Sequence, residues 1–349
     1  MAQHVSDMSS ASTPQHAAWL SPRPDGRYCA AGDFWIDPHG GKDKALVTHG
    51  HADHARPGHK AVLATEETLA IMRARYGAGS GESQQAIAYG EVLKIGDVEV
   101  SFYPAGHVLG SAQILLEYQG ERIVVSGDYK RREDPTCARF EVVPCDIFIT
   151  EATFGLPVFV HPETPDEVDK LLAAQAQSPD RTLLVGAYAL GKCQRVIRHL
   201  REKGYDRTIY LHGAMVALCD LYEDLGVPLG PLQQVFVKEV GKLPGEIVFC
   251  PPGQLSDRWA RRFADPITAF ASGWMRVRQR AKQRGVELPL IISDHADWSE
   301  LTQTITDIAP REVWVTHGRE DALVYWCESQ GISAQALSLV GRGEDMDDG

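Results

Sequence analysis

The sequence has no apolar run long enough to cross a membrane, and its first 15 residues lack the apolar segment of a secretion signal. Its seven cysteines are scattered, odd in number and free of Cys-x-x-Cys pairs. This pattern argues against a disulfide framework and against a zinc ribbon, and it suits a reducing cytoplasm. There is also no internal repeat of fixed period and no low-complexity linker. These absences argue against a membrane protein, a disulfide scaffold and a repeat protein.

Basic residues are in the minority, with 35 lysines and arginines against 47 acidic residues and a net charge of −12. A sequence-independent nucleic-acid binder usually has a basic footprint, so this balance counts against that class. Two bound divalent ions would offset it locally by about four charges, and basic residues can gather on one face. The composition is otherwise that of an ordinary soluble globular protein, and 349 residues are enough for about two domains.

The pattern of apolar segments changes along the chain. The first part predicts strands at 34–36, 45–47, 98–103, 113–118, 122–125 and 146–150, with a helix at 65–75. From about residue 164 the pattern alternates, with helices from 164 and at 192–203 and strands at 182–186 and 208–211. Strands at 288–293 and 312–316 follow, separated by a helix at 298–308. The alternation predicts an α/β unit with a parallel sheet.

The stretch 47–54 places three imidazoles and one carboxylate within six positions, directly after an apolar strand. These side chains belong to His49, His51, Asp53 and His54. Imidazole and carboxylate are ligands of divalent ions such as Zn²⁺, and packing offers no reason to gather them in one loop. The stretch therefore predicts a metal site.

Three later loops also place a polar side chain just past a strand, and they carry His107, Asp128 and His317. One such histidine alone is more often a hydrogen-bonded structural residue. A sheet that aligns these strand ends would, however, bring six or seven nitrogen and oxygen ligands together, without a thiolate. Such a set is enough for two metal ions that each keep an open position.

This ordered ligand set resembles the signature of the metallo-β-lactamase superfamily. The resemblance implies an α/β fold, namely a four-layer αββα sandwich with a dinuclear centre between its sheets. It implies that three histidines hold one metal, that two further residues belong to the second, and that a carboxylate bridges the two. These are, in that order, His49, His51 and His107, then Asp53 and His54, then Asp128. The two divalent ions would be Zn²⁺, with Mn²⁺ as the alternative.

Four downstream segments are similar to elements of the β-CASP nucleases within that superfamily. They lie at 150–155, 188–194, 293–298 and 316–318, and the whole resemblance spans about residues 28–321. It implies an α/β β-CASP cap domain at 157–287, inserted into a metallo-β-lactamase domain made of 21–156 and 288–340. The start, 1–20, is expected to be disordered, and 341–349 reads as an acidic tail. The resemblance is greatest to the bacterial ligase-associated DNA exonucleases.

One position departs from part of this family. The DNA cross-link repair branch typically has valine at the last ligand position, where this chain has His317, as in the RNA-processing branch. The histidine favours a complete second metal site, and it leaves the choice between DNA and RNA open.

The resemblance also points to Asp53, Glu151 and His295 as catalytic residues. Phosphodiester hydrolysis needs an activated water, neutralised phosphate oxygens and a stabilised leaving oxygen. We expect His295 to contact the scissile phosphate or to donate to the leaving group, with Glu151 fixing its tautomer. The alternative is that Glu151 and His295 only hydrogen-bond to groups around the metals.

Lys192, Trp274 and Arg276 are candidates for binding nucleic acid. A lysine at a helix start after glycine predicts a backbone-phosphate contact, and a tryptophan in a basic run predicts base stacking. The alternatives are an exposed helix lysine and a solvated, charged helix face. Three further histidines are interpreted as structural, namely His39, His59 and His212.

These features predict a metal-dependent nuclease that acts on phosphodiester bonds. The resemblance favours a DNA exonuclease that prepares DNA ends, single-stranded or exposed, for a DNA ligase as functional partner. An RNA-processing nuclease of the mRNA 3′-end type is the alternative. A small-molecule hydrolase would need no inserted segment, and a non-catalytic binding subunit should have lost ligands, none of which is missing here.

Overall fold

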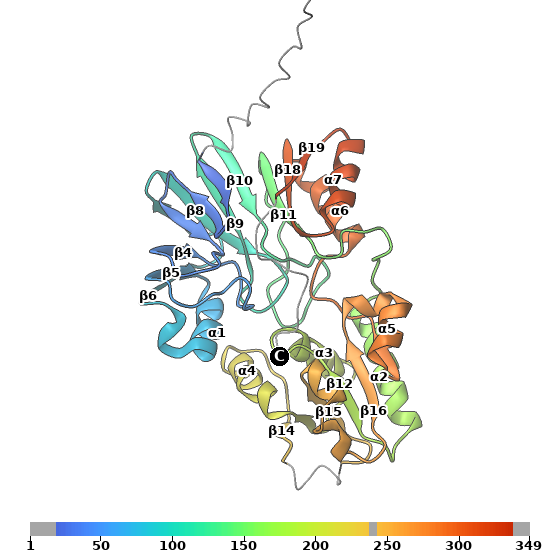
Figure 1. Ribbon diagram of the computed structural model, residues 1–349. Coiled ribbons are helices and arrows are strands. Elements are labelled where there is room, and N and C mark those ends of the chain that lie inside the picture. The colour runs from blue at the N-terminus through green and yellow to red at the C-terminus, as the bar shows by residue number, and fades with distance from the viewer. Residues whose placement is uncertain (1–18, 237–242, 338–349) are drawn as a thin grey trace, which may run out of the picture.

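The computed structural model describes residues 19–236 and 243–337, which form three β-sheets (Figure 1). The first sheet follows the sequence order β1 (Leu20–Arg23), β2 (Gly26–Cys29), β3 (Phe34–Ile36), β4 (Lys44–Leu46), β5 (Ala61–Ala64) and β6 (Ser83–Ala86). The second has the order β19 (Ser333–Ala336), β18 (Glu312–Gly318), β11 (Ile147–Ala152), β10 (Glu121–Val125), β9 (Ala112–Tyr118), β8 (Val98–Pro104) and β7 (Val92–Ile95). We call the part of the chain built on these two sheets the first lobe.

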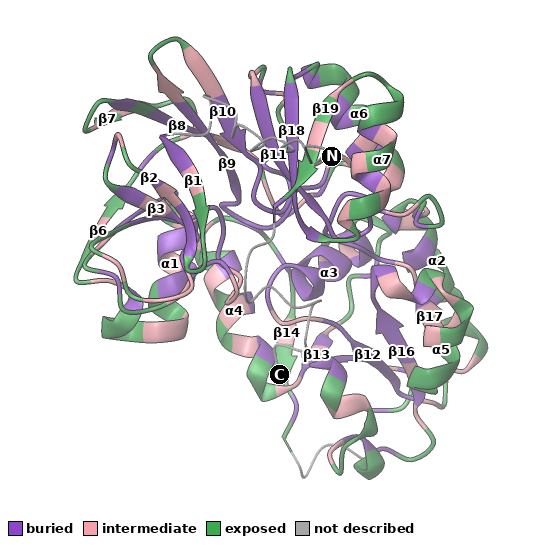
Figure 2. Ribbon diagram, turned by 45° about the horizontal axis from the view of Figure 1, so that its top comes forward, coloured by how far each residue is buried: buried purple, intermediate pink, exposed green. Residues whose placement is uncertain are grey.

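The first two sheets share one apolar core. Phe34 and Leu46 of the first sheet belong to the same buried cluster as Phe102, Ile114 and Trp314 of the second. These side chains are almost completely removed from water, and Figure 2 shows the strands that carry them as buried. Burial of apolar surface on facing sheets is the main force that holds such a sandwich together.

Helices cover the outer faces of both sheets. They are α1 (Glu66–Tyr76), α6 (Trp298–Ile308) and α7 (Glu320–Ser329). Leu69 of α1 packs with Val62 of the first sheet, while Leu301 of α6 and Leu323 of α7 pack with Phe148 of the second. The layers therefore run helix, sheet, sheet, helix, and the predicted αββα sandwich is confirmed.

The third sheet defines a second lobe, and all of its strand pairs are parallel. Its order is β14 (Leu232–Gln234), β13 (Ile209–Leu211), β15 (Ile247–Cys250), β12 (Leu183–Gly186), β16 (Ile267–Ala271) and β17 (Leu288–Leu290). Its helices are α2 (Thr164–Gln177), α3 (Lys192–Glu202), α4 (Gly213–Asp224) and α5 (Arg278–Arg284). Short 3₁₀ turns lie at η2 (Gly77–Ser80), η4 (Pro252–Ser256), η5 (Ala260–Arg262) and η6 (Gly273–Arg276).

The second lobe is an insertion in the sequence of the first. It lies between β11 and β18, which are neighbouring parallel strands of the second sheet. The α/β unit predicted from the change of pattern is therefore confirmed, and so is its insertion, which the resemblance implied. Strand β17 pairs with β16, so the third sheet runs to Leu290 and passes the expected cap boundary at 287. The remaining domain boundaries stay a prediction.

Several elements match the predicted ranges closely, including α1, α3 and α6. The strand predicted at 288–293 is shorter, because only 288–290 pair with a neighbour. Residues 1–20 were predicted to be disordered, but Trp19 and Leu20 are buried and β1 begins at Leu20. Residues 1–18 lie outside the described residues. The predicted acidic tail at 341–349 also lies outside them. Across 19–236 and 243–337, no helix combines the length and apolarity needed to cross a membrane.

Candidate metal centre and active site

The predicted ligand loops converge at one edge of the sandwich. The stretch from His49 to His54 follows β4 of the first sheet, whereas His107 and Asp128 follow β8 and β10 of the second. His317 lies at the end of β18 in a left-handed conformation with φ 66°. Because strands of both sheets end at this edge, residues up to 268 positions apart in sequence lie together.

Two groups of ligand atoms form there, and Asp128 belongs to both. Ligand atoms of His49, His51, His107 and Asp128 lie within 4.8 Å of one another, and so do those of His54, Asp128 and His317. Ligand atoms of His49, Asp53 and His54 form a third group, also within 4.8 Å of one another. Oδ2 of Asp128 lies 3.2 Å from Nε2 of His54 and 3.5 Å from Nε2 of His49. One shared carboxylate between two ligand groups is the arrangement expected for two metal ions.

The donor atoms are in the state that metals require. Burial holds the pKa of His49 and His107 well below the usual value, so these imidazoles are neutral. Burial opposes ionisation of Asp128, but His54 and His49 outweigh it and hold the Asp128 pKa well below its usual range. Among the described residues, Nε2 of His49 and both ring nitrogens of His317 are buried without a hydrogen-bond partner. Buried ring nitrogens without a partner and an ionised carboxylate fit a divalent cation, so these residues are consistent with a metal site.

Asp37 supports this site, although it was not singled out from the sequence. Its buried carboxylate accepts hydrogen bonds from the Thr48 backbone N–H and the Thr48 hydroxyl, each at 2.8 Å. Its Oδ2 also lies 2.8 Å from Nδ1 of His54, which therefore carries the proton and leaves Nε2 toward Asp128. Such carboxylate–imidazole pairs orient metal ligands. The only signal in the sequence was an aspartate at the end of a strand neighbouring the histidine loop.

Glu151 and His295 form a buried pair beside the metal ligands. Oε2 of Glu151 lies 3.0 Å from Nδ1 of His295, and its Oε1 accepts a hydrogen bond from the Tyr129 N–H at 2.8 Å. The His295 ring lies 4.7 Å from that of His107, and ligand atoms of Asp128, Glu151 and His295 form a further close group. Burial opposes protonation of His295, but Glu151, helped by Asp128, raises the His295 pKa to about 10. With a pKa this high, the His295 imidazole would be protonated near neutral pH.

Lys192 does not lie on the surface, contrary to the alternative of an exposed helix lysine. Its ammonium is buried, lies 3.0 Å from the Asp294 carboxylate and sits over the Tyr188 ring at 4.5 Å. Helix α3 begins at Lys192, as predicted, with Gly191 as its cap.

Trp274 and Arg276 lie on η6, near the Glu151–His295 pair. The Trp274 ring packs against Phe154 at 4.7 Å and Phe159 at 5.2 Å, and the Arg280 guanidinium covers it at 4.0 Å. These contacts leave the ring half-buried, so only part of it is open to the predicted base stacking. Arg276 is exposed, and α5 has no buried residue, as expected for a solvated charged helix.

His212 and His59, which the sequence indicated to be structural, each accept a hydrogen bond from a backbone N–H. Nδ1 of His212 accepts the Ala214 N–H at the start of α4, and Nδ1 of His59 accepts the Lys42 N–H. All seven cysteines are free thiols, as predicted.

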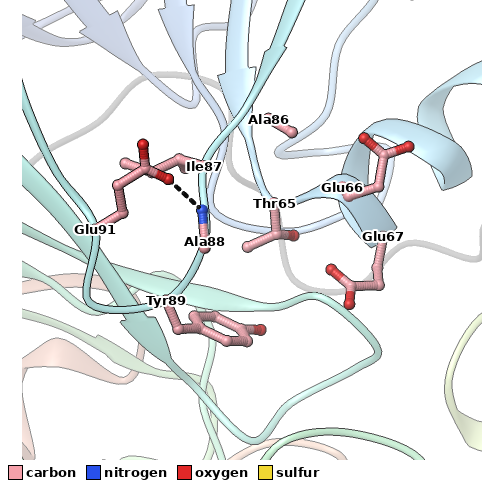
Figure 3. Close-up of a pocket in the computed structure, with 8 residues that line it drawn as sticks. All are labelled: Thr65, Glu66, Glu67, Ala86, Ile87, Ala88, Tyr89 and Glu91. Atoms are coloured by element: carbon pink, nitrogen blue, oxygen red, sulfur yellow. Dashed lines mark hydrogen bonds between the residues drawn. The ribbon is translucent and has the colours of Figure 1, made fainter.

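A pocket separate from the ligand groups lies beside the start of α1 (Figure 3). It is lined by Thr65, Glu66, Glu67, Ala86, Ile87, Ala88, Tyr89 and Glu91, none of which is a candidate ligand. Two lining residues hold the loop that carries His107. The Thr65 hydroxyl donates to the Gly110 carbonyl oxygen at 2.6 Å, and the Tyr89 hydroxyl donates to the Ser111 carbonyl oxygen at 2.9 Å.

The sandwich, the ligand set and the inserted parallel sheet match the metallo-β-lactamase fold with a β-CASP-like insertion, as the resemblance in the sequence implied. No protein-family model matches the chain. Over 325 residues, 92% of its length, it is 28% identical to a "Probable DNA ligase" of Opitutus terrae, of which it covers 31%. Over 122 residues, 34% of its length, it is 34% identical to the "Endoribonuclease ysh-1" of Neurospora crassa, of which it covers 14%. The chain thus spans less than a third of either relative.

A solved structure shares the fold across most of the chain. It is a protein of unknown function from Enterococcus faecalis V583, with a TM-score of 0.59 and 14% identity, covering 86% of this chain and 80% of that one. This likeness supports the architecture alone.

Proposed function

We propose that the chain is a metal-dependent phosphodiesterase that degrades DNA from an end and prepares that end for ligation. The observation that carries the proposal is the shared Asp128, which joins two ligand groups beside the buried Glu151–His295 pair. Support for DNA comes from the similarity over 92% of the chain to a probable DNA ligase. A DNA ligase is accordingly the proposed functional partner. The free thiols fit a reducing cytoplasm.

Each group has a proposed role. His49, His51 and His107 would hold one ion, Asp53, His54 and His317 would hold the second, and Asp128 belongs to a group on each side. Two divalent ions, Zn²⁺ or alternatively Mn²⁺, would supply an acidified water and neutralise the phosphate oxygens.

His295 is proposed as the proton donor to the leaving oxygen, because it is cationic and lies beside the metal ligands. Glu151 holds its Nδ1–H, which leaves Nε2 for the substrate. Arg276 is proposed as an exposed contact for the nucleic-acid backbone.

The runner-up is an RNA-processing nuclease, which the partial similarity to an endoribonuclease and the presence of His317 favour. A small-molecule hydrolase of this fold would not need the inserted parallel sheet.

The test uses the metal-loaded chain with 3′-labelled single-stranded DNA, duplex DNA and RNA, and resolves product lengths. We expect metal-dependent shortening of DNA from the 5′ end, with RNA intact. Asp53→Ala and His107→Ala should each abolish hydrolysis while circular dichroism shows an intact fold. Internal cleavage of RNA alone would favour the runner-up, and binding of DNA without cleavage would overturn the proposed enzyme.

A further inference from the structure

We infer that the second lobe positions two histidines of the metal site, through the short segment from Leu190 to Arg195 at the start of α3. Metal binding by the first lobe then depends on docking of the second. The inference rests on the metal site proposed above, but not on the identity of the substrate. Helix α3 lies where the two lobes meet (Figure 1), and most of its residues are buried.

The first contact fixes His51. Its Nε2 lies 3.4 Å from the backbone carbonyl oxygen of Leu190, which belongs to the second lobe. A carbonyl oxygen can only accept, so this contact places the proton on Nε2. The other nitrogen, Nδ1, is then a lone pair directed at the ligand group, 2.9 Å from Nε2 of His107.

The second contact fixes the ring of His107 through Asp294. Nδ1 of His107 lies 2.9 Å from the Asp294 backbone carbonyl oxygen, so Nδ1 carries the proton and Nε2 faces the metal site. The Asp294 carboxylate is buried, and Lys192 lies 3.0 Å from it. Lys192 therefore stabilises the backbone turn that orients His107.

The third contact fixes the backbone of His107. Nη2 of Arg195 donates to the His107 carbonyl oxygen at 2.8 Å, and its Nε forms an ion pair with Asp134. Arg195 is only 1% exposed, so this pair is desolvated and a missing partner would be costly. Lys192 and Arg195 are three positions apart on α3 and lie on neighbouring turns of one face.

The loop that carries His107 is also embedded in the second lobe by packing. Leu109 belongs to the same apolar cluster as the core of the third sheet, and its N–H lies 3.4 Å from the Tyr222 hydroxyl of α4. Gly191 has φ +84°, and a Cβ there would lie 2.4 Å from Cγ1 of Val108. Only glycine allows this approach. The hydroxyls of Thr65 and Tyr89, which line the pocket in Figure 3, also hold this loop.

The test compares metal affinity, which does not require nuclease activity. Arg195→Met removes the donor to His107, and the double variant Arg195→Met with Asp134→Asn removes the ion pair without leaving a buried carboxylate. Arg198→Met is the matched control, because Arg198 lies on the same helix but donates to Pro228 within the second lobe. Zn²⁺ affinity is measured by competition with a chelator, and folding by circular dichroism.

We expect the double variant to fold and to bind Zn²⁺ about 10- to 100-fold more weakly, the range for lost supporting contacts around metals. The control should bind as tightly as the unchanged chain. A folded double variant with unchanged Zn²⁺ affinity would overturn the inference. If the unchanged chain binds Zn²⁺ but cleaves no nucleic acid, the proposed function fails and this comparison still stands.

Variants of Lys192 provide an independent test of the same inference. Lys192→Met should weaken Zn²⁺ binding, whereas Lys192→Arg, which keeps the charge beside Asp294, should restore most of it. If Lys192→Met leaves Zn²⁺ affinity unchanged and only raises KM for DNA, Lys192 contacts a phosphate and its assignment here is wrong.

Discussion

Glu151 lies on β11 and His295 lies between β17 and α6, and Oε2 of Glu151 is 3.0 Å from Nδ1 of His295. Both side chains are buried, and the Thr153 hydroxyl donates to the same Glu151 oxygen at 2.5 Å. The carboxylate is thus held in one orientation and in turn holds the imidazole ring. A proton donor in a fixed position is what general acid catalysis requires.

Glu151→Gln should lower kcat by about 100-fold or more, because a neutral amide neither favours the His295 cation nor fixes its tautomer. KM should change much less, since the ligand loops are not altered. Steady-state hydrolysis of labelled DNA checks this, with Arg198→Met as control. A kcat within about twofold of the unchanged chain would show that Glu151 does not support the proton donor.

Asp37→Ala should weaken Zn²⁺ binding by about 10- to 100-fold, because His54 loses the carboxylate that holds its Nδ1–H. Chelator competition measures the change. Asp25→Ala is a suitable control, since Asp25 is an exposed carboxylate that pairs with Lys42. Equal affinity in Asp37→Ala and in the control would contradict the orienting role.

His161 should make the fold sensitive to acid. Burial lowers the His161 pKa from 6.5 to about 3. The cations Lys130, Arg132 and Lys192 lower it further, whereas the Asp297 carboxylate raises it. The unfolded chain therefore binds a proton that the folded chain does not between these pH values. The contribution of His161 to stability is complete above pH 6.5 and is lost as pH falls toward 3.

The variant His161→Phe should accordingly reduce the slope of unfolding free energy against pH by up to about 1.4 kcal/mol per pH unit in that window. Urea unfolding at a series of pH values measures both slopes. Parallel curves for the variant and the unchanged chain would show that His161 does not titrate on unfolding.

Trp274→Ala should reduce the free energy of unfolding by about 2 to 3 kcal/mol, because the ring packs on Phe154 and Phe159. The exposed neighbour Arg276→Ala should change it by less than about 0.5 kcal/mol. Urea denaturation compares the two variants. If Trp274→Ala instead leaves stability unchanged and weakens DNA binding, the tryptophan stacks on a base as the sequence suggested.

The sequence allowed the candidate ligands to be predicted because their pattern is local. His49 to His54 are adjacent, and His107, Asp128 and His317 each follow a recognisable strand. Parallel and antiparallel strands ending at one edge then bring them together.

The supporting contacts depend on how distant segments dock, and no local pattern shows that. Asp37 meets His54 across two loops, and Leu190 and Arg195 reach His51 and His107 from another lobe. Lys192 lies at a predicted helix start, but its burial against Asp294 follows only from the packing of the lobes.

The most direct test of the two-metal site is a titration of metal-free chain with Zn²⁺, counting bound metal per chain and following hydrolysis of 5′-labelled single-stranded DNA at each step. Because Asp128 belongs to both ligand groups, we predict that about two ions bind per chain and that hydrolysis rises with the second. In His54→Ala, one ion should remain and hydrolysis should be lost. Full hydrolysis with a single bound ion, or in the metal-free chain, would contradict the two-metal site.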